Sequence, residues 1–178
     1  MLIATTAAAQ LPASNGTTAD HHASTAAPIA IEADAAEQDE KKGVTTYRGN
    51  VAIVQGPLSI KADKVQIISR SDGEKRNVEK ITASGSPAIF THQAINVADN
   101  ISAEANNIDY HLLQGRVLLE NRASLVQQGS SVSGDSIEYF IAEKRVKAAA
   151  GSRSGNGQNG RVRTVITPGS GMLFGSEN

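Results

Sequence analysis

The sequence predicts an all-β protein, and three observations support this fold class. Apolar side chains recur with a period of two, turn signals separate short segments, and one run of segments occurs twice. Many short segments of this kind, joined by regular turns, are typical of an antiparallel β fold. A chain of 178 residues fits one domain that can bury a core of its own.

Alternation between apolar and polar residues defines each expected strand in turn. It places one set of side chains on each face of a strand, whereas a helix would need a period near 3.6. The alternating residues, in chain order, are Ile29 and Ile31, Val51 and Ile53, Val65 and Ile67, Ile108, Tyr110 and Leu112, and Ile137, Tyr139 and Ile141. The turn signals between them are Gly56-Pro57, Ser71-Asp72-Gly73, Gly85-Ser86-Pro87, Gly115, Gly129 and the Gly-rich stretch 151–160.

An internal repeat organises these strands into two similar runs. A shift of the chain by about 72 residues aligns the two halves without gaps. The aligned segments are IAIEAD (29–34) with ISAEAN (101–106), and residues 49–67 with residues 121–139. Apolar positions coincide, as in Val65 with Ile137, and Asp63 falls on Asp135. Two stacked runs of strands that contact only their neighbours leave an open sheet edge at each end.

Composition excludes several classes of function. The chain carries 17 basic and 18 acidic residues and a net charge of −1, whereas nucleic-acid-binding proteins usually have a strong basic excess. It contains no cysteine, which excludes a disulfide scaffold, thiolate metal sites and thiol catalysis. With only 3% aromatic residues, its core must consist of Val, Ile, Leu and Ala. No apolar run approaches the roughly 18–20 residues that cross a bilayer as a helix.

Motifs for cofactor or metal binding are weak. GNGQNG (155–160) has the letters of a dinucleotide-binding fingerprint, but RVRTVIT (161–167) follows as an expected strand where that motif needs a helix. The neighbours His21 and His22 lack a third metal ligand. We therefore expect no cofactor and no metal site.

Carboxylates are the remaining candidates for catalysis. They are Glu32, Asp34, Asp63, Glu104, Asp109 and Asp135. No nucleophile–base pattern accompanies them, and the recurrence of Asp63 and Asp135 beside expected turns favours a role in those turns. We therefore expect no catalytic residues.

Charges are unevenly distributed along the chain. Between Asp20 and Glu40 there are six acidic residues and no basic residue, whereas between Lys144 and Arg163 there are six basic residues and no acidic one. Both stretches could be solvated faces, or they could lie at opposite ends of the sheet, where complementary charges would orient a head-to-tail contact. On the second hypothesis, the candidate interface residues are Glu32, Asp34, Arg161 and Arg163.

The interior of such a sheet has two possible states. A core of β-branched side chains can close completely, or it can remain an open groove that takes acyl chains and gains about 0.8 kcal/mol for each buried CH₂ group. Basic residues at the rim of a groove would meet phosphate groups. Composition does not distinguish a lipid-binding groove from a filled core, so both hypotheses stay open.

Four segments resemble the periplasmic lipopolysaccharide-transport bridge proteins, the LptA/OstA-like family. They are PIAIEAD (28–34), YRGNVAIVQGPLSIKADKVQI (47–67), ASGSPAIF (83–90) and DSIEYFIAEKRVKA (135–148). The Gly-Asn-Val start with its Gln-Gly turn, and the Ile-x-Ala-Asp-Lys-Val strand that follows, are the most specific parts. The likeness covers residues 28–168.

The resemblance implies an open antiparallel β-jellyroll of roughly sixteen strands whose interior groove holds the acyl chains of lipid A. By resemblance, the groove entrance includes Ile29 and Ile31, and the interior includes Phe90, Tyr110 and Leu112. Alternation alone adds Val51, Ile53, Ile60, Val65 and Ile67 as lining candidates.

The resemblance also implies a location and partners. The family is not enzymatic, since a separate transporter uses ATP, and its copies stack end to end between two membranes. The chain is therefore expected in the periplasm, bound to lipopolysaccharide and to further copies of itself, with no nucleic acid. An inner-membrane transport complex is expected at the N-terminal edge, and an outer-membrane translocon at the C-terminal edge.

Domain organisation follows from these assignments. We expect a disordered segment over 1–27, the jellyroll domain over 28–168, and a flexible tail over 169–178 that is partly derived from an expression tag. The alternative hypothesis is a structural, filament-forming β protein with a filled core and no lipid ligand. An enzyme acting on carbohydrate ranks third.

Overall fold

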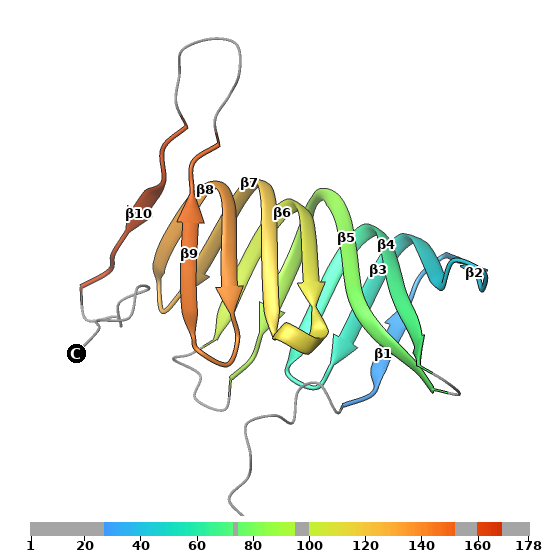
Figure 1. Ribbon diagram of the computed structural model, residues 1–178. Coiled ribbons are helices and arrows are strands. Elements are labelled where there is room, and N and C mark those ends of the chain that lie inside the picture. The colour runs from blue at the N-terminus through green and yellow to red at the C-terminus, as the bar shows by residue number, and fades with distance from the viewer. Residues whose placement is uncertain (1–26, 73–74, 95–99, 152–159, 169–178) are drawn as a thin grey trace, which may run out of the picture.

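Nearly all of the described chain is antiparallel β-sheet, which confirms the predicted fold class (Figure 1). The computed structural model describes residues 27–72, 75–94, 100–151 and 160–168. These residues form ten strands in one sheet and one short 3₁₀-helix, η2 (Leu112–Gln114). The predicted N-terminal disordered segment, the C-terminal tail, the His21–His22 pair and most of the Gly-rich stretch lie outside the described residues.

The strands follow one another across the sheet. In chain order they are β1 (Ile29–Glu32), β2 (Ala35–Asp39), β3 (Val44–Gln55), β4 (Leu58–Asp72), β5 (Lys75–His92), β6 (Ile101–His111), β7 (Arg116–Gln127), β8 (Ser130–Phe140), β9 (Arg145–Ala149) and β10 (Arg163–Val165). From β3 to β8, each strand pairs with the next. At one end β1 and β2 both pair with β3, and at the other end β9 and β10 both pair with β8. Within the described residues, the sheet therefore has two open edges.

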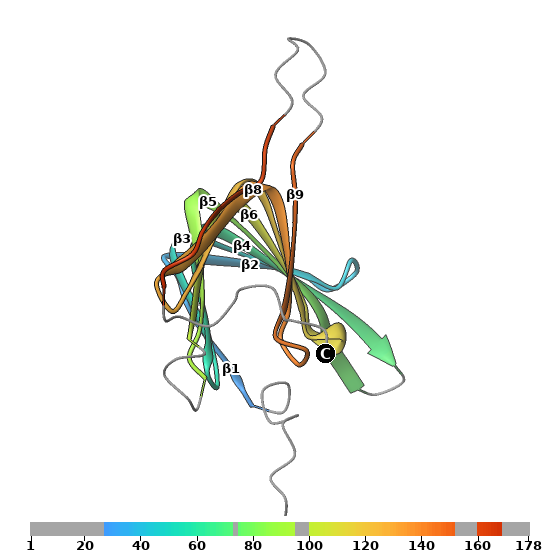
Figure 2. The ribbon, with the colours of Figure 1, turned by 90° about the vertical axis from the view of Figure 1, so that its left-hand side faces the viewer.

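Every long strand bends near its middle. The register shifts at these points, for example between Arg48 and Val51 in β3 and between Glu120 and Ala123 in β7. The bends divide the sheet into two walls: the β1 wall, which includes β1 and β10, and the β2 wall, which includes β2 and β9. Viewed along the sheet, the walls meet at the line of bends and diverge from it, so the cross-section is a V (Figure 2). The fold is an open β-jellyroll.

The strand count depends on how the bends are treated. Each of the six strands from β3 to β8 contributes one half to each wall, while β1, β2, β9 and β10 contribute a single half each. The described residues thus form ten strands, or sixteen half-strands in eight antiparallel passes. This difference in counting accounts for the roughly sixteen strands that the family resemblance implies.

Left-handed backbone conformations form two of the bends. Gly49 and Asn50 have φ angles of 77° and 47°, and Asn121 and Arg122 have φ angles of 63° and 60°. Gly adopts this conformation without strain and Asn tolerates it, whereas it is costly for Arg. The second run therefore makes the same bend as the first from less suitable residues.

The repeat predicted from the sequence is confirmed residue by residue. At the first bend, Asp34 Oδ2 accepts a hydrogen bond from Asn50 Nδ2 (2.9 Å). At the equivalent place in the second run, Asn106 Oδ1 accepts one from Arg122 Nη2 (2.9 Å). Strand pairing also matches, because the pairs Ile31–Ile53 and Ala103–Leu125 are related by the same shift.

Two expectations about turns are wrong. Gly85-Ser86-Pro87 was expected to end a strand, but it lies inside β5 at the bend, where the register shifts between Ser84 and Ala88. The segments on both sides continue to pair with β4 and β6, and Pro lacks the N–H that a ladder position needs. Asp63 and Asp135 also lie at bends, in β4 and β8, and not beside turns. A bend interrupts the strand pairing as a turn does, so the same residue types (Gly, Ser, Pro and Asp) occur at both.

Leu112 is not in a strand. The alternation of Ile108, Tyr110 and Leu112 predicts one strand through all three, but β6 ends at His111 and Leu112 begins η2. Gly115, in a left-handed conformation (φ 54°), closes this turn through its N–H, which donates to the Leu112 carbonyl (3.1 Å). Leu112 is nevertheless buried, because the turn folds it back over the interior.

The inward faces of the two walls form one apolar cluster. Its largest fully buried side chains are Tyr110, Tyr139 and Phe90, and Ala, Val, Ile and Leu supply the rest. Aliphatic residues dominate, as the low aromatic content predicts, but three of the chain's six aromatic side chains are also part of the core. Among the described residues, no helix has the length and apolar character needed to span a membrane.

Candidate functional site: an apolar interior and two open edges

The predicted lipid-contacting residues line the interior of the V on both walls. The β1 wall contributes Ile29, Ile31, Val51, Ile53, Ile60 and Phe90, and the β2 wall contributes Val65, Ile67, Tyr110 and Leu112. Alternation assigned the faces of the strand residues correctly, because every second residue of a strand points to the same side. Leu112 reaches the interior from η2, and Phe90 was expected there by the family resemblance. Segments far apart in the sequence therefore meet in one apolar cluster.

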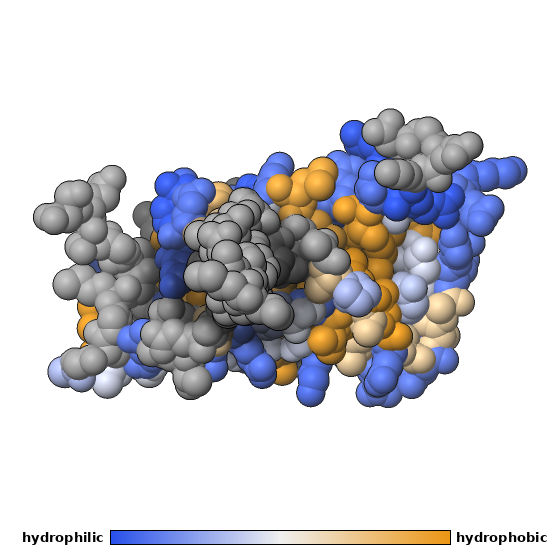
Figure 3. Space-filling model, turned by 90° about the horizontal axis from the view of Figure 1, so that it is seen from below, coloured by the Kyte–Doolittle hydropathy of each residue, from blue (hydrophilic) through white to orange (hydrophobic). Residues whose placement is uncertain are grey.

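This interior is largely filled by its own side chains. Val65 is 0% exposed, Phe90 is 1% exposed and Leu112 is 6% exposed. Ile29 and Ile31, at the β1 edge, are only partly buried against the cluster. Because protein interiors are close-packed, an acyl chain can enter only where the walls separate or where the interior is still exposed. Seen from below, apolar side chains are visible between hydrophilic rims, which locates an exposed part of the apolar surface (Figure 3).

A polar contact between His92 and Tyr139 joins the two walls across the interior. The Nδ1 atom of His92, at the end of β5 in the β1 wall, lies 3.2 Å from the hydroxyl of Tyr139, in the β2 wall. The two rings are tilted, with centroids 6.2 Å apart. Both residues lie toward the strand ends that face the open side of the V, so this hydrogen bond helps to hold the walls together there.

Charged residues on the β2 wall are paired with one another. Lys80 and Asp109 form an ion pair, and Arg116 Nη1 lies 2.8 Å from Glu138 Oε1. His111 lies between the two cations, opposite Lys80 on one side and Arg116 on the other. Burial, followed by repulsion from Arg116 and Lys80, lowers the pKa of His111 below its usual value of 6.5. Neutral His111 is therefore favoured in the folded protein.

The second run contributes interior side chains that the candidate set lacks. The repeat relates Ile53 to Leu125, Ile60 to Val132, Val65 to Ile137 and Ile67 to Tyr139, and all eight are buried. The signal for them is present in the sequence, because the shift that aligns the two runs also aligns their inward-facing positions.

The two open edges carry opposite charges. The acidic residues of the β1/β2 edge are Glu32, Asp34, Glu37 and Asp39, and the basic residues at the β9/β10 edge are Arg145, Lys147, Arg161 and Arg163. The acidic and basic stretches thus lie at opposite ends of the sheet, as one of the two sequence hypotheses requires. All four candidate interface residues, Glu32, Asp34, Arg161 and Arg163, are exposed.

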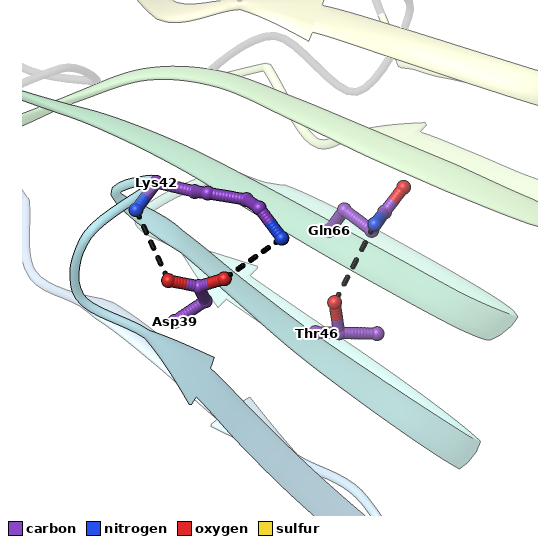
Figure 4. A network of polar contacts seen from close by, with 4 residues as sticks. All are labelled: Asp39, Lys42, Thr46 and Gln66. Atoms are coloured by element: carbon purple, nitrogen blue, oxygen red, sulfur yellow. Dashed lines mark hydrogen bonds and ion pairs between the residues drawn. The ribbon is translucent and has the colours of Figure 1, made fainter.

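Several acidic groups at the first edge already have partners within the chain. Asp39 accepts hydrogen bonds from the backbone N–H (3.1 Å) and the Nζ (3.0 Å) of Lys42, near the Gln66–Thr46 contact of the next strands (Figure 4). These hydrogen bonds lower the pKa of Asp39, and Asp39 in turn raises the pKa of Lys42. Asp34 is bound to Asn50 at the bend, so its carboxylate serves the fold as well as the edge.

In the part of the chain that the structure describes, no three His, Asp or Glu side chains converge as a metal site. Asp63 and Asp135, the recurrent carboxylates, lie at the bends of β4 and β8 and belong to the repeat.

Comparison with known families fits the open jellyroll. Residues 30–145 match the family model described as LptA/(LptD N-terminal domain) LPS transport protein. The chain belongs to this family. Its members are described as transport proteins, in agreement with the resemblance carried by the Gly-Asn-Val segment and the strand that follows it.

Individual relatives cover most of the chain. Lipopolysaccharide export system protein LptH of Pseudomonas aeruginosa is 32% identical over 143 residues, which are 79% of this chain and 79% of LptH. The LptA proteins of Haemophilus influenzae and Escherichia coli are each 36% identical over 141 residues, which are 79% of this chain and 77% and 71% of theirs. The crystal structure of LptH, called the LptA homologous periplasmic component of the lipopolysaccharide transport device, matches with a TM-score of 0.73 at 30% identity. That match covers 82% of this chain and 99% of the LptH chain.

Proposed function

We propose that this protein transports lipopolysaccharide through the periplasm by holding the acyl chains of lipid A between its two walls. The observation that carries this proposal is the V-shaped sheet, whose two walls are continuous with each other only along the line of bends and enclose one apolar cluster. The relatives named lipopolysaccharide export system proteins, one of them called a periplasmic component, support the same substrate and compartment.

Entry of an acyl chain exchanges one set of apolar contacts for another. Each CH₂ group that leaves water contributes about 0.8 kcal/mol, and this gain offsets the contacts that the walls lose on separating. Ile29 and Ile31 meet the lipid first, because they are the partly exposed members of the interior. Phe90, Tyr110 and the other buried candidates contact lipid once the walls have opened.

The open edges give the protein a way to bridge two membranes. An unpaired strand edge can pair with a strand of another chain, and the opposite charges of the two edges favour head-to-tail addition. In the proposed assembly, the β1/β2 edge meets an inner-membrane transport complex or a preceding copy. The β9/β10 edge meets a following copy or an outer-membrane translocon.

One observation favours the alternative hypothesis of a structural β protein. The interior side chains are already buried without a ligand, as a filled core requires. The two functions differ in what happens when lipid is added: a transport protein opens and binds it, whereas a structural protein does not.

Binding of lipid in solution distinguishes them. We expect purified protein at micromolar concentration to shield a fluorescent acyl probe from water, and lipopolysaccharide to displace the probe. Ile31→Asp should weaken binding about 10- to 100-fold, because it sets an uncompensated charge against acyl chains. The control is Val54→Asp on the neighbouring strand, where the side chain is 50% exposed on the outer face. Absence of binding by the parent protein would favour the structural alternative.

A further inference from the structure

The internal repeat contains a template for the contact between two copies. The shift that aligns the runs carries β6 (Ile101–His111) onto the segment from Ile29 to Asp39, which forms β1 and β2. The strand that precedes β6 is β5, and it pairs with β6 along both walls. If β9 and β10 are the equivalents of β5, the β5–β6 contact describes how the two open edges fit each other.

Strand pairing shows that β9 and β10 are the equivalents of β5. In the β2 wall, Ile67 of β4 pairs with Ile81 of β5, and the equivalent Tyr139 of β8 pairs with Val146 of β9. In the β1 wall, the pair Ile60–Phe90 corresponds to the pair Val132–Thr164, which joins β8 to β10. Both halves of β5 therefore have counterparts at the C-terminal edge.

The two open edges of the molecule therefore correspond to the two partners of the β5–β6 contact: the β9/β10 edge to β5, and the β1/β2 edge to β6. β5 is covered by β6, whereas among the described residues β9 and β10 pair with β8 only, and β1 and β2 pair with β3 only. We propose that a second copy docks its β1/β2 edge on β9 and β10 in the register of the β5–β6 pair. This inference rests on the proposed head-to-tail assembly and adds the register and the paired residues.

The register sets basic residues opposite acidic ones. Transfer of the β5–β6 pairs to the junction gives Arg145 opposite Asp39, Lys147 opposite Glu37, Ala148 opposite Ala36, Arg163 opposite Glu32, and Thr164 opposite Ile31 of the second copy. The remaining transferred pairs are uncharged, so three pairs join opposite charges and none joins like charges. Opposite charges directly across an antiparallel pair stabilise it.

Neighbouring registers lack this match. Because side chains alternate between faces, a shift that keeps the same faces must be of two residues. A shift of this size in one direction forms two opposite-charge pairs, Lys147–Asp39 and Arg163–Asp34, but sets Arg145 opposite Lys41. In the other direction only Arg145, opposite Glu37, has an acidic partner. The charge pattern of the edges therefore selects the register that the repeat provides.

Burial supports the same contact. Ile29 and Ile31 are only partly buried, but their equivalents in β6, Ile101 and Ala103, are 3% and 2% exposed beneath β5. Docking in this register would cover Ile29 and Ile31 in the same way. The apolar interior of one copy would then continue into the next.

One of the three opposite-charge pairs consists of residues that form no ion pair within the described chain. Glu37 and Asp39 already lie near Arg48 and Lys42, and Arg145 lies 2.7 Å from Glu143. In contrast, no ion pair joins Glu32 or Arg163 to another residue in the described ranges. The Glu32–Arg163 pair is therefore the best place for a charge exchange.

Disulfide crosslinking tests the register, and the absence of native cysteine makes it specific. Directly opposed residues of an antiparallel pair have Cα atoms about 4.5–5.5 Å apart, within the range that a disulfide spans. We expect a mixture of the full chain carrying Ala148→Cys and the full chain carrying Ala36→Cys to form a covalent dimer on oxidation. The matched control replaces Ala36→Cys by Gln38→Cys, two residues away on the same face, and should yield several-fold less dimer.

The outcomes separate the register from the assembly. More dimer with Gln38→Cys than with Ala36→Cys would overturn the register while leaving head-to-tail contact intact. No dimer in either mixture would overturn both. Acyl-probe binding by the same single-cysteine proteins reports independently on the lipid-binding proposal.

Charge exchange gives a second, independent test. Glu32→Arg alone and Arg163→Glu alone should each lower the association constant measured by light scattering by about 3- to 10-fold. The protein with both changes carries the pair in exchanged order, so it should regain most of the parent's association. Failure of the double variant to exceed the single variants would contradict the pairing.

Discussion

The two repeats make the same bend with different residues. The first uses Gly49 and Asn50, and the second uses Asn121 and Arg122, yet all four have positive φ angles. The side-chain bridge across the bend is also preserved, although its donor changes from Asn50 to Arg122. The repeat therefore preserves the backbone path and the pairing register, because the strands on both sides of the bend pair across the whole sheet. The residues at the bend itself can vary, even where the backbone conformation is strained.

The repeats differ most at their last strand. In the first, β5 is an unbroken strand of 18 residues that is covered on both sides. In the second, its place is taken by β9 and β10, which have 5 and 3 residues and pair only with β8 in the described chain. In the first repeat the last strand is thus paired on both sides, and in the second it leaves an open sheet edge among the described residues.

Equivalent positions in these last strands should differ most in stability. Phe90 in β5 is 1% exposed, whereas its equivalent Thr164 in β10 is exposed. Phe90→Ala should lower the free energy of unfolding by about 3–5 kcal/mol, whereas Thr164→Ala should change it by less than about 0.5 kcal/mol. Urea unfolding followed by circular dichroism measures both. Similar values for the two variants would show that β10 is packed like β5.

Burial also separates two candidate lipid contacts. Phe90→Asp should prevent folding, because it buries a charge with no partner, so it cannot report on lipid binding alone. Ile31 is partly exposed at the edge, so Ile31→Asp should leave the unfolding transition within about 1 kcal/mol of the parent. A fully unfolded Ile31→Asp protein would mean that Ile31 is an ordinary core residue.

Bend residues should respond in opposite directions. Gly49→Ala should destabilise the protein by about 1–2 kcal/mol, because Ala is strained at a φ angle of 77° and its Cβ would clash with the Asp34 carboxylate. Asn121→Gly, at the equivalent position, should stabilise it by up to about 1 kcal/mol, because Gly adopts a φ angle of 63° without strain. Thermal unfolding of both variants measures the difference, and a loss of stability in Asn121→Gly would contradict it.

Salt should affect the edges and leave the interior unchanged. Raising ionic strength from about 0.05 to 0.5 M should slow self-association roughly tenfold, because the acidic and basic edges no longer attract each other at a distance. Stopped-flow light scattering measures the rate, and urea unfolding in the same buffers serves as the control for the fold. An association rate that does not change with salt would show that the edge charges do not steer the contact.

The smallest predicted effect is a pH dependence of stability caused by His111, which occupies in the second run the position of Asp39 in the first. Because the pKa of His111 is lowered, the folded state binds fewer protons than the unfolded state, and stability should fall as the pH drops below about 6.5. His111→Gln should remove this part of the pH dependence between pH 7.5 and 5.5. The pKa of Asp39 is lowered from 3.8 by Lys42, so its contribution is lost only below that value. An unchanged pH slope in the variant would contradict the assignment to His111.

Much of this architecture is visible in the sequence. Alternation identified the inward faces of the strands. Inward-facing positions such as Ile53 and Val65 are buried and must therefore be apolar, and this requirement is visible in the sequence as a period of two. The repeat indicated that the molecule ends in two open edges, and the uneven charges indicated their opposite signs. Each of these properties follows from a pattern along the sequence, so it can be predicted from one sequence.

Other features could not be predicted from local pattern. A bend within a strand and a turn between strands need the same residues, so Gly85-Ser86-Pro87 predicts a turn although it lies at a bend inside β5. The fold of the sheet into a V, and the contact between His92 and Tyr139 across it, depend on how distant strands lie in space. Neither does the sequence reveal that the interior is filled by its own side chains without a ligand.

Photo-crosslinking in cells tests most directly whether the interior holds lipid. A photoreactive amino acid at position 31, on the inner face of β1, is compared with one at position 54, on the outer face of the strand paired with it. We expect a covalent adduct with lipopolysaccharide at position 31 and none at position 54. Equal labelling at both positions, or labelling at position 54 alone, would contradict the claim that acyl chains lie between the walls.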